Sequence, residues 1–167
     1  SIAFNDPKNI DEMRGVYIPF WLYDCSLDSS IEADSHRVAT WSDSRYNYVK
    51  TDIFKSHRAG NINFKKIPVD GSTHFDDDIM NSIEPFDYDK LVEFNYSYLF
   101  GFLSEEYDVE KEKAYEDAIA RAKSSVETEL RNNITGFATV TILDSKHKAT
   151  LNKVNYALFP VWLLNIK

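Results

Sequence analysis

Four histidines and one cysteine are the side chains of this chain best suited to act as bases, nucleophiles or metal ligands. They are His36, His57, His74, His147 and Cys25. A nucleophile needs a base within hydrogen-bonding distance and a third group that orients the base. None of the histidines lies in a recognisable catalytic motif, and the simplest role for Cys25 is to pack beside an apolar strand. We therefore predict no catalytic residue among them.

Carboxylates are plentiful, and most of them gather where helices are expected to begin. The stretches "FDDDIM" and "SEEYDVEKE" place acidic side chains near helix N-termini, where they complement free N–H groups and the helix dipole. Asp76–Asp78 with His74 would offer ligands to magnesium or calcium, but the spacing and glycine of a calcium loop are missing. The chain has no P-loop, GxGxxG, HExxH or GxSxG motif. We predict no metal site, and a hydrolase-type alternative would require His74, Asp76 and Asp77 to converge in a pocket.

The most promising surface is a basic segment between residues 45 and 66. Six cations lie in this segment against Asp52 alone, in a chain with a formal net charge of −8. Aromatic rings set between cations on a sheet face can stack bases while Lys and Arg contact phosphates. The alternative is that the aromatics face the core and the cations face water; an anionic membrane or an acidic protein would also suit such a surface. The predicted anion or nucleic-acid surface comprises Arg45, Tyr46, Tyr48, Lys50, Lys55, Arg58, Lys65 and Lys66.

Length and composition indicate one ordinary domain with a real core. The chain has 167 residues, of which 43% are hydrophobic and 14% aromatic. Apolar runs such as Ala157–Leu164 are too short to span a bilayer, and no leader for secretion opens the sequence. A single cysteine cannot form an internal disulfide and fits a reducing compartment. We expect a cytoplasmic location, at the inner face of the membrane if a parent protein is anchored there.

The hydrophobic pattern predicts an α+β fold. Residues 1–14 read as a lead-in arm, and residues 15–70 as four strands of an antiparallel meander with turns at "SLDSS", "WSDSR" and Ala59–Asn61. Residues 76–132 read as helical: a helix over "IMNSI", a second over "YSYLFGFLSEEY", and a third from Val109 to about Asn132, capped by Asp108. Residues 135–167 return to strands, with a polar turn at Ser145–Lys148. We expect about 6–7 strands, 2–3 helices packed on the sheet, and a single domain over 15–167.

Two similar five-residue sequence motifs, here called the proline-containing lines, lie near the two ends of the chain. They are Ile18-Pro19-Phe20-Trp21-Leu22 and Phe159-Pro160-Val161-Trp162-Leu163. Proline has no N–H to donate, so each line must lie at an edge or where the ladder is interrupted. The two lines are either similar strands of one sheet, or neighbours or duplicates that bring Trp21 and Trp162 into one cluster. Because "WLLNIK" ends without a breaker, we also expect the chain to be a fragment of a longer protein.

Several stretches resemble one family of uncharacterised bacterial proteins that carry an N-terminal zinc ribbon. They are "GVYIPFWLYD", "TWSDSRYNY", "HRAGNINFKKIPVDGS", "MNSIEPFDY" and "YALFPVWLLN", in this order over most of the chain. Members are often labelled as related to the primosomal replication-restart helicase. The resemblance implies that this chain follows the ribbon, that zinc belongs to the absent ribbon of the parent, and that a membrane-spanning stretch comes later.

These observations favour a non-catalytic scaffold or binding domain of a larger, membrane-tethered bacterial protein. Its partner would be another protein or other domains of the parent. The alternatives are a nucleic-acid-binding module that uses the 45–66 hairpin, and an enzyme with an unrecognised site. We predict no cofactor in this chain.

Overall fold

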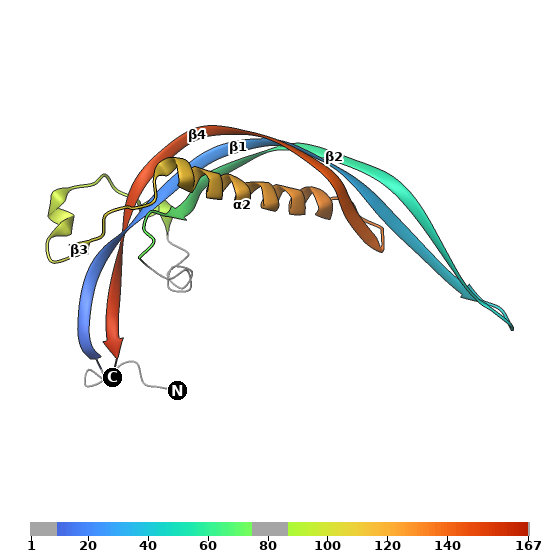
Figure 1. The fold of residues 1–167 in the computed structure, drawn as a ribbon, viewed down its shortest axis with the longest axis horizontal. Helices are drawn as coiled ribbons and strands as arrows, with labels where there is room; N and C mark the ends of the chain where they lie inside the picture. The colour runs from blue at the N-terminus through green and yellow to red at the C-terminus, as the bar shows by residue number, and fades with distance from the viewer. Residues whose placement is uncertain (1–9, 75–86, 167) are drawn as a thin grey trace. The chain divides into compact units, whose positions relative to one another are not determined.

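Very long strands dominate the computed structural model, which describes residues 10–74 and 87–166 (Figure 1). Within these residues the chain forms a mixed sheet of four strands, one α-helix and two short 3₁₀ helices. The strands are β1 (Ile10–Ser42), β2 (Asn47–Asp70), β3 (Leu103–Ser104) and β4 (Thr139–Ile166). The helices are η2 (Tyr88–Lys90), η3 (Tyr96–Leu99) and α2 (Lys111–Asn132). The predicted α+β fold with six or seven antiparallel strands and two or three packed helices is therefore wrong.

The strand count was too high because three predicted turns lie inside continuous strands. "SLDSS" belongs to β1, Ala59–Asn61 to β2 and Ser145–Lys148 to β4. Their polar side chains bond across the sheet: Asn61 Nδ2 donates to Asp28 Oδ1 at 2.6 Å, and Ser29 Oγ lies 2.9 Å from His147 Nδ1. The three stretches therefore form one polar band across neighbouring strands. The turn at "WSDSR" is confirmed, since Asp43 N donates to Tyr46 O at 2.9 Å.

Among the helices, the amphipathic one is confirmed as α2. Its predicted apolar stripe is buried at Ile119, Ala122, Val126 and Leu130. The helix predicted over "YSYLFGFLSEEY" is instead the short η3, capped by Asn95, followed by a turn at Gly101 (φ +83°) and by β3. The helix predicted over "IMNSI" lies outside the described residues. Of the predicted lead-in arm, residues 10–14 already belong to β1.

The chain divides into two compact units. The first comprises residues 1–23, 66–117 and 154–167, and the second residues 24–65 and 118–153. The two units differ in charge: the first holds 18 carboxylates against 7 cations, and the second 9 carboxylates against 12 cations.

In the first unit, the two proline-containing lines form one core. Alternate side chains of β1 pack with alternate side chains of β4, and Tyr88 packs against them; the cluster is Val16, Ile18, Phe20, Leu22, Ala157, Phe159 and Val161. The tryptophans lie outside this cluster. Trp21 contacts Tyr107 and Tyr156, whereas Trp162 contacts Phe102. The two lines are thus neighbours, but they do not bring their tryptophans together.

Pro19 lies at the predicted interruption of the ladder. Its carbonyl accepts a hydrogen bond from Gly71 N at 2.9 Å, just beyond the end of β2, and the carbonyl of Tyr17 accepts one from Glu105 N at 3.0 Å, just beyond β3. Carbonyls two residues apart in a strand point to the same edge. β3, which runs parallel to β1 with Val16 opposite Leu103, therefore follows β2 along that edge. The missing N–H of Pro19 falls in the gap between them.

In the second unit, α2 covers one face of the sheet. Alternate β1 side chains from Cys25 to Ser35 are buried on that face. Leu130 of α2 packs over Gly60 of β2, with its Cδ2 3.8 Å from where a Cβ would stand. Glu127 of α2 contacts His147 of β4. Beyond the last turn of α2 the β1–β2 hairpin continues, and among the described residues no helix is drawn over that part of it (Figure 1).

Candidate functional site

The β1–β2 hairpin exposes its aromatic side chains. In residues 37–57, here called the hairpin arm, Trp41, Tyr46, Tyr48 and Phe54 are between 38% and 64% exposed. The alternative in which these rings face a core is therefore wrong. A strand pair with large rings in water on this scale is unusual for a surface without a partner. The hairpin arm is consequently the first candidate for a binding surface.

One face of the hairpin arm, here called the aromatic face, carries two groups of aromatic side chains. Trp41 and Tyr48 lie opposite each other and stack with 5.5 Å between ring centroids and 11° between planes; Tyr46 meets Tyr48 edge-on at 6.3 Å. Further along the same face, the Arg37 guanidinium lies 5.2 Å from the Phe54 centroid and 5.5 Å from that of Phe137. The predicted alternation of Tyr46, Tyr48 and Phe54 on one face is thus confirmed, and β1 contributes Trp41 and Arg37 to it.

Asp43 holds the tip of this face in place. Its Oδ1 accepts hydrogen bonds from the backbone N–H groups of Arg45 (2.7 Å) and Tyr46 (2.8 Å), and its Oδ2 accepts one from the Tyr48 hydroxyl (2.9 Å). These bonds, the one from Arg45 above all, lower the pKa of Asp43, and the bond to Asp43 raises the pKa of Tyr48. The turn therefore presents its tyrosines in a fixed arrangement.

Two of the predicted cations form ion pairs with carboxylates of the hairpin. Lys50 pairs with Asp52 (3.1 Å) and Lys55 with Asp34 of β1 (2.6 Å). Residues 24–65 together hold six cations and six carboxylates, because β1 contributes acidic residues that a window starting at residue 45 leaves out. Over residues 24–65, the excess positive charge seen in the 45–66 window is therefore balanced.

The structure also separates the predicted cations along β2. Arg45 and Lys50 lie near the tip with Tyr46 and Tyr48, whereas Lys55, Arg58 and Lys65 follow further along the strand. Arg58 Nη1 donates to the carbonyl of His57 at 2.8 Å. Lys66 belongs to the other unit, where its Nζ donates to the carbonyl of Tyr88 (2.8 Å) and to Asp89 Oδ1 (3.1 Å).

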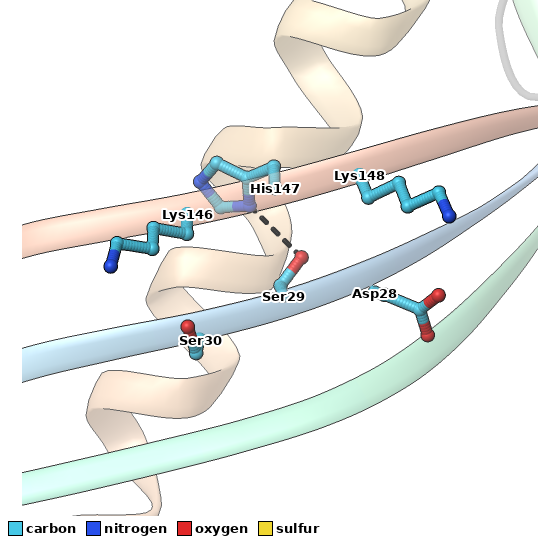
Figure 2. A pocket seen from close by; sticks show the side chains of 6 residues that line it. All are labelled: Asp28, Ser29, Ser30, Lys146, His147 and Lys148. Atoms are coloured by element: carbon cyan, nitrogen blue, oxygen red, sulfur yellow. Dashed lines mark hydrogen bonds between the residues drawn. The ribbon is translucent and has the colours of Figure 1, made fainter.

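A hydrogen-bonded Ser–His–Glu line lies between the sheet and α2. Ser29 Oγ of β1 is 2.9 Å from His147 Nδ1, and His147 Nε2 is 2.9 Å from Glu127 Oε1 of α2 (Figure 2 shows Ser29 and His147). Hydrogen bonds from Ser145 and then His147 lower the pKa of Glu127. His147 was expected in a polar turn. The sequence signal that could have placed it is the alternation of Ser145, His147 and Ala149 with the charged residues Asp144, Lys146 and Lys148.

This line has the residue types of a catalytic triad but not the exposure of one. The His147 side chain is 8% exposed, and Ser29 is 6% exposed. A shallow hollow of about 350 Å³ adjoins them, lined by Asp28, Ser29, Ser30, Lys146, His147 and Lys148 (Figure 2). Because nucleophile and base are both more than nine-tenths buried, they expose little surface to a substrate carbonyl in this hollow. The line links β1, β4 and α2.

His74 lies in an exposed acidic cluster of the first unit. Its Nδ1 is 2.8 Å from Glu105 Oε1 and 3.8 Å from Asp108 Oδ2. Asp108 accepts hydrogen bonds from the hydroxyl and then the backbone N–H of Thr73, and these lower its pKa. The helix α2 begins only at Lys111 and both carboxylate oxygens of Asp108 bond to Thr73, so the prediction that Asp108 caps this helix is wrong. Asp76–Asp78, which the metal and hydrolase alternatives require, lie outside the described residues. In the part of the chain that the structure describes, no group of three His, Cys, Asp or Glu side chains is placed to hold a metal ion.

Cys25 and His36 do not form a reactive pair in the second unit. Cys25 is fully buried, and burial raises the pKa of its thiol, with Asp24 adding to the effect. The backbone carbonyl of His36 accepts a hydrogen bond from Ala138 N at 2.8 Å. His57 lies 3.8 Å from Glu32 across the hairpin. Cys25 is itself a residue of β1 and has a structural position in the core of the sheet.

Comparison with other proteins relates the chain to a bacterial protein of uncharacterised function. The chain is 32% identical over 165 residues to the uncharacterized protein YdjG of Bacillus subtilis (strain 168). The match covers 98% of this chain and 48% of YdjG, so the chain spans about half the length of that relative. No family model and no solved structure matches the sequence. Across residues 10–74 and 87–166, no helix combines the length and apolar character that crossing a membrane would require.

Proposed function

We propose that this chain is a non-catalytic binding domain and that the hairpin arm docks a protein partner. The observation that carries the proposal is the exposed aromatic face, built from Trp41, Tyr46, Tyr48 and Arg37. Tryptophan, tyrosine and arginine are the residue types that dominate binding energy at protein interfaces.

The fixed arrangement of the side chains at the turn of the hairpin arm supports this role. Tyr48 is restrained by stacking on Trp41 and by the bond to Asp43, so little rotational freedom remains to be lost on binding. The balance of six cations and six carboxylates also favours a protein surface over a polyanion. Large rigid rings with mixed charges around them form the centre and the rim of a protein interface.

Other domains of a longer parent are the proposed partner. The relative YdjG extends well beyond the matched region, and the resemblance to ribbon-containing, membrane-tethered proteins agrees with such a parent. Zinc would then belong to the parent's ribbon. Metal analysis of the purified 167-residue chain is expected to find no stoichiometric zinc.

The test is a calorimetric titration of the 167-residue chain with the part of YdjG that lies outside the match, which measures the affinity between them. The double variant Trp41→Ala, Tyr48→Ala should weaken binding at least about a hundredfold, since each removes an anchor of about 2 kcal/mol or more. The control Lys55→Ala, which changes a rim salt bridge, should change the affinity less than about fivefold. Unchanged affinity of the double variant would refute the proposal.

Nucleic-acid binding is the second candidate, because exposed rings beside Arg37 and Arg45 can stack bases. It predicts retention of oligo(dT) or oligo(U) at low salt, a steep fall in affinity with salt, and a further loss in Arg58→Glu or Lys65→Glu. The neutral charge balance of residues 24–65 leads us to expect no such retention.

A further inference from the structure

A second aromatic surface lies in the first unit and takes no part in the proposed protein docking. Residues 91–101, here called the aromatic tip, carry Leu91, Val92, Phe94, Tyr96, Tyr98 and Phe100. Phe100 is 92% exposed, Tyr96 83% and Val92 71%. Rings this exposed are costly in water, and a group of them marks an interaction site.

The aromatic tip is anchored at its C-terminal side. The Phe102 ring packs with 5.0 Å between centroids against both Tyr17 and Trp162. It lies directly on Gly15, where an added Cβ would come within 2.5 Å of the ring. β3 then pairs with β1.

The N-terminal side of the aromatic tip is anchored as well. Tyr88 packs edge-on against Phe159 of the core at 5.9 Å, and its carbonyl accepts a hydrogen bond from Lys66 Nζ at 2.8 Å. Within the tip, Asn95 Oδ1 accepts a hydrogen bond from Ser97 N at 2.9 Å, and Phe94 meets Tyr96 at 5.2 Å. The exposure therefore arises in a segment that is held at both ends and folded between them.

The shape of this exposure favours a fluid partner over a rigid one. A ring that is nine-tenths exposed has few contacts with its own chain, so both of its faces and its edge lie in water. A flat protein surface could contact only one side of such a ring. The apolar part of a bilayer can surround such a ring, while tyrosine hydroxyls stay with the headgroups. Glu93 is the only charged residue between residues 91 and 104, so the tip carries almost no charge into the membrane.

The charge of the first unit determines which lipids fit. With 18 carboxylates against 7 cations, this unit is repelled by an anionic surface. We propose that the aromatic tip inserts into the interfacial region of a bilayer whose headgroups are zwitterionic, and that burial of Phe100, Tyr96 and Val92 provides the attraction.

Flotation of the 167-residue chain with phosphatidylcholine vesicles tests this inference. The wild-type chain should float with the vesicles, and added salt should not release it. Phe100→Ser with Tyr96→Ser should reduce partitioning at least about a hundredfold, because each ring contributes about tenfold or more. The matched control is Val49→Ser with Ile53→Ser, which removes two apolar side chains that are 69% and 61% exposed in the other unit and should leave partitioning unchanged.

A reporter variant locates the contact. Phe100→Trp should show a blue shift with vesicles and quenching by brominated lipid tails, and phosphatidylglycerol should weaken binding. Absence of flotation, flotation unaffected by the tip variants, or binding that requires anionic lipid would each overturn the inference. Self-association in the absence of vesicles that Phe100→Ser abolishes would also overturn it, in favour of a second copy of the chain.

Discussion

Replacement of Gly15 by alanine should destabilise the protein through one identifiable clash. The new Cβ would stand 2.5 Å from Cε1 and 2.6 Å from Cδ1 of Phe102, closer than such atoms can approach. The Phe102 ring cannot move freely, because Tyr17 and Trp162 each pack against it. The substitution therefore forces the anchor of the aromatic tip out of place.

The expected cost follows from two opposing terms. Overpacking of this kind costs about 1–3 kcal/mol. Gly15 does not have a left-handed φ, so alanine also restricts the unfolded chain and recovers about 0.4–1 kcal/mol. The net loss should be about 1–2 kcal/mol of unfolding free energy.

Urea unfolding of a double-mutant cycle measures this term. Wild type, Gly15→Ala, Phe102→Ala and the double variant are compared, with Gly60→Ala as control because its new Cβ meets only Leu130 at an ordinary 3.8 Å. Once Phe102 is removed, Gly15→Ala should be neutral or slightly stabilising, giving a coupling of at least about 1 kcal/mol. Effects that add within about 0.4 kcal/mol would show that the clash is not the cause.

Three further outcomes are expected for stability. Leu27→Ala, at a fully buried β1 position, should cost about 2–5 kcal/mol in urea unfolding. Hydrogen bonds from Ser145 and His147 lower the pKa of Glu127 in the folded state. These bonds therefore stabilise the fold at pH values above the ordinary pKa of glutamate, and the stabilisation is lost as the pH falls through the lowered pKa. Glu127→Gln should therefore lie below wild type at neutral pH and approach it in acid, as urea midpoints against pH will show. Burial, with a smaller effect of Glu112, raises the pKa of Tyr23 to about 12 in the folded state. Because the tyrosine of the unfolded chain ionises first, the wild-type protein should lose stability from about pH 10 to 12. The Tyr23→Phe variant should lack this loss.

Sequence patterns predicted the structural elements that depend on interactions between residues close together in the chain. The 3.6-residue period from Ile119 to Leu130 indicated α2, because one apolar stripe on a helix has to be buried. "WSDSR" indicated the hairpin turn, since Asp43 bonds to N–H groups two and three residues further on. The alternation of Tyr46, Tyr48 and Phe54 indicated their shared face.

Partners distant in the chain decided the rest. "SLDSS" has the composition of a turn, yet it continues β1 because Asn61 and His147 satisfy Asp28 and Ser29 from neighbouring strands. No local pattern shows that β3 lies parallel beside Val16, or that Asp34 of β1 pairs with Lys55 of β2.

The sequence alone therefore determined the amphipathic helix, the hairpin turn and the alternating faces of this protein, since each depends on residues within a few positions of one another. Only the tertiary structure decided which strands are continuous, which aromatic rings are exposed to water and which charged side chains form ion pairs. The physical reason is that a polar or aromatic side chain takes its role from the group across the sheet, and for Ser29 and His147 that group lies 118 residues away in the chain.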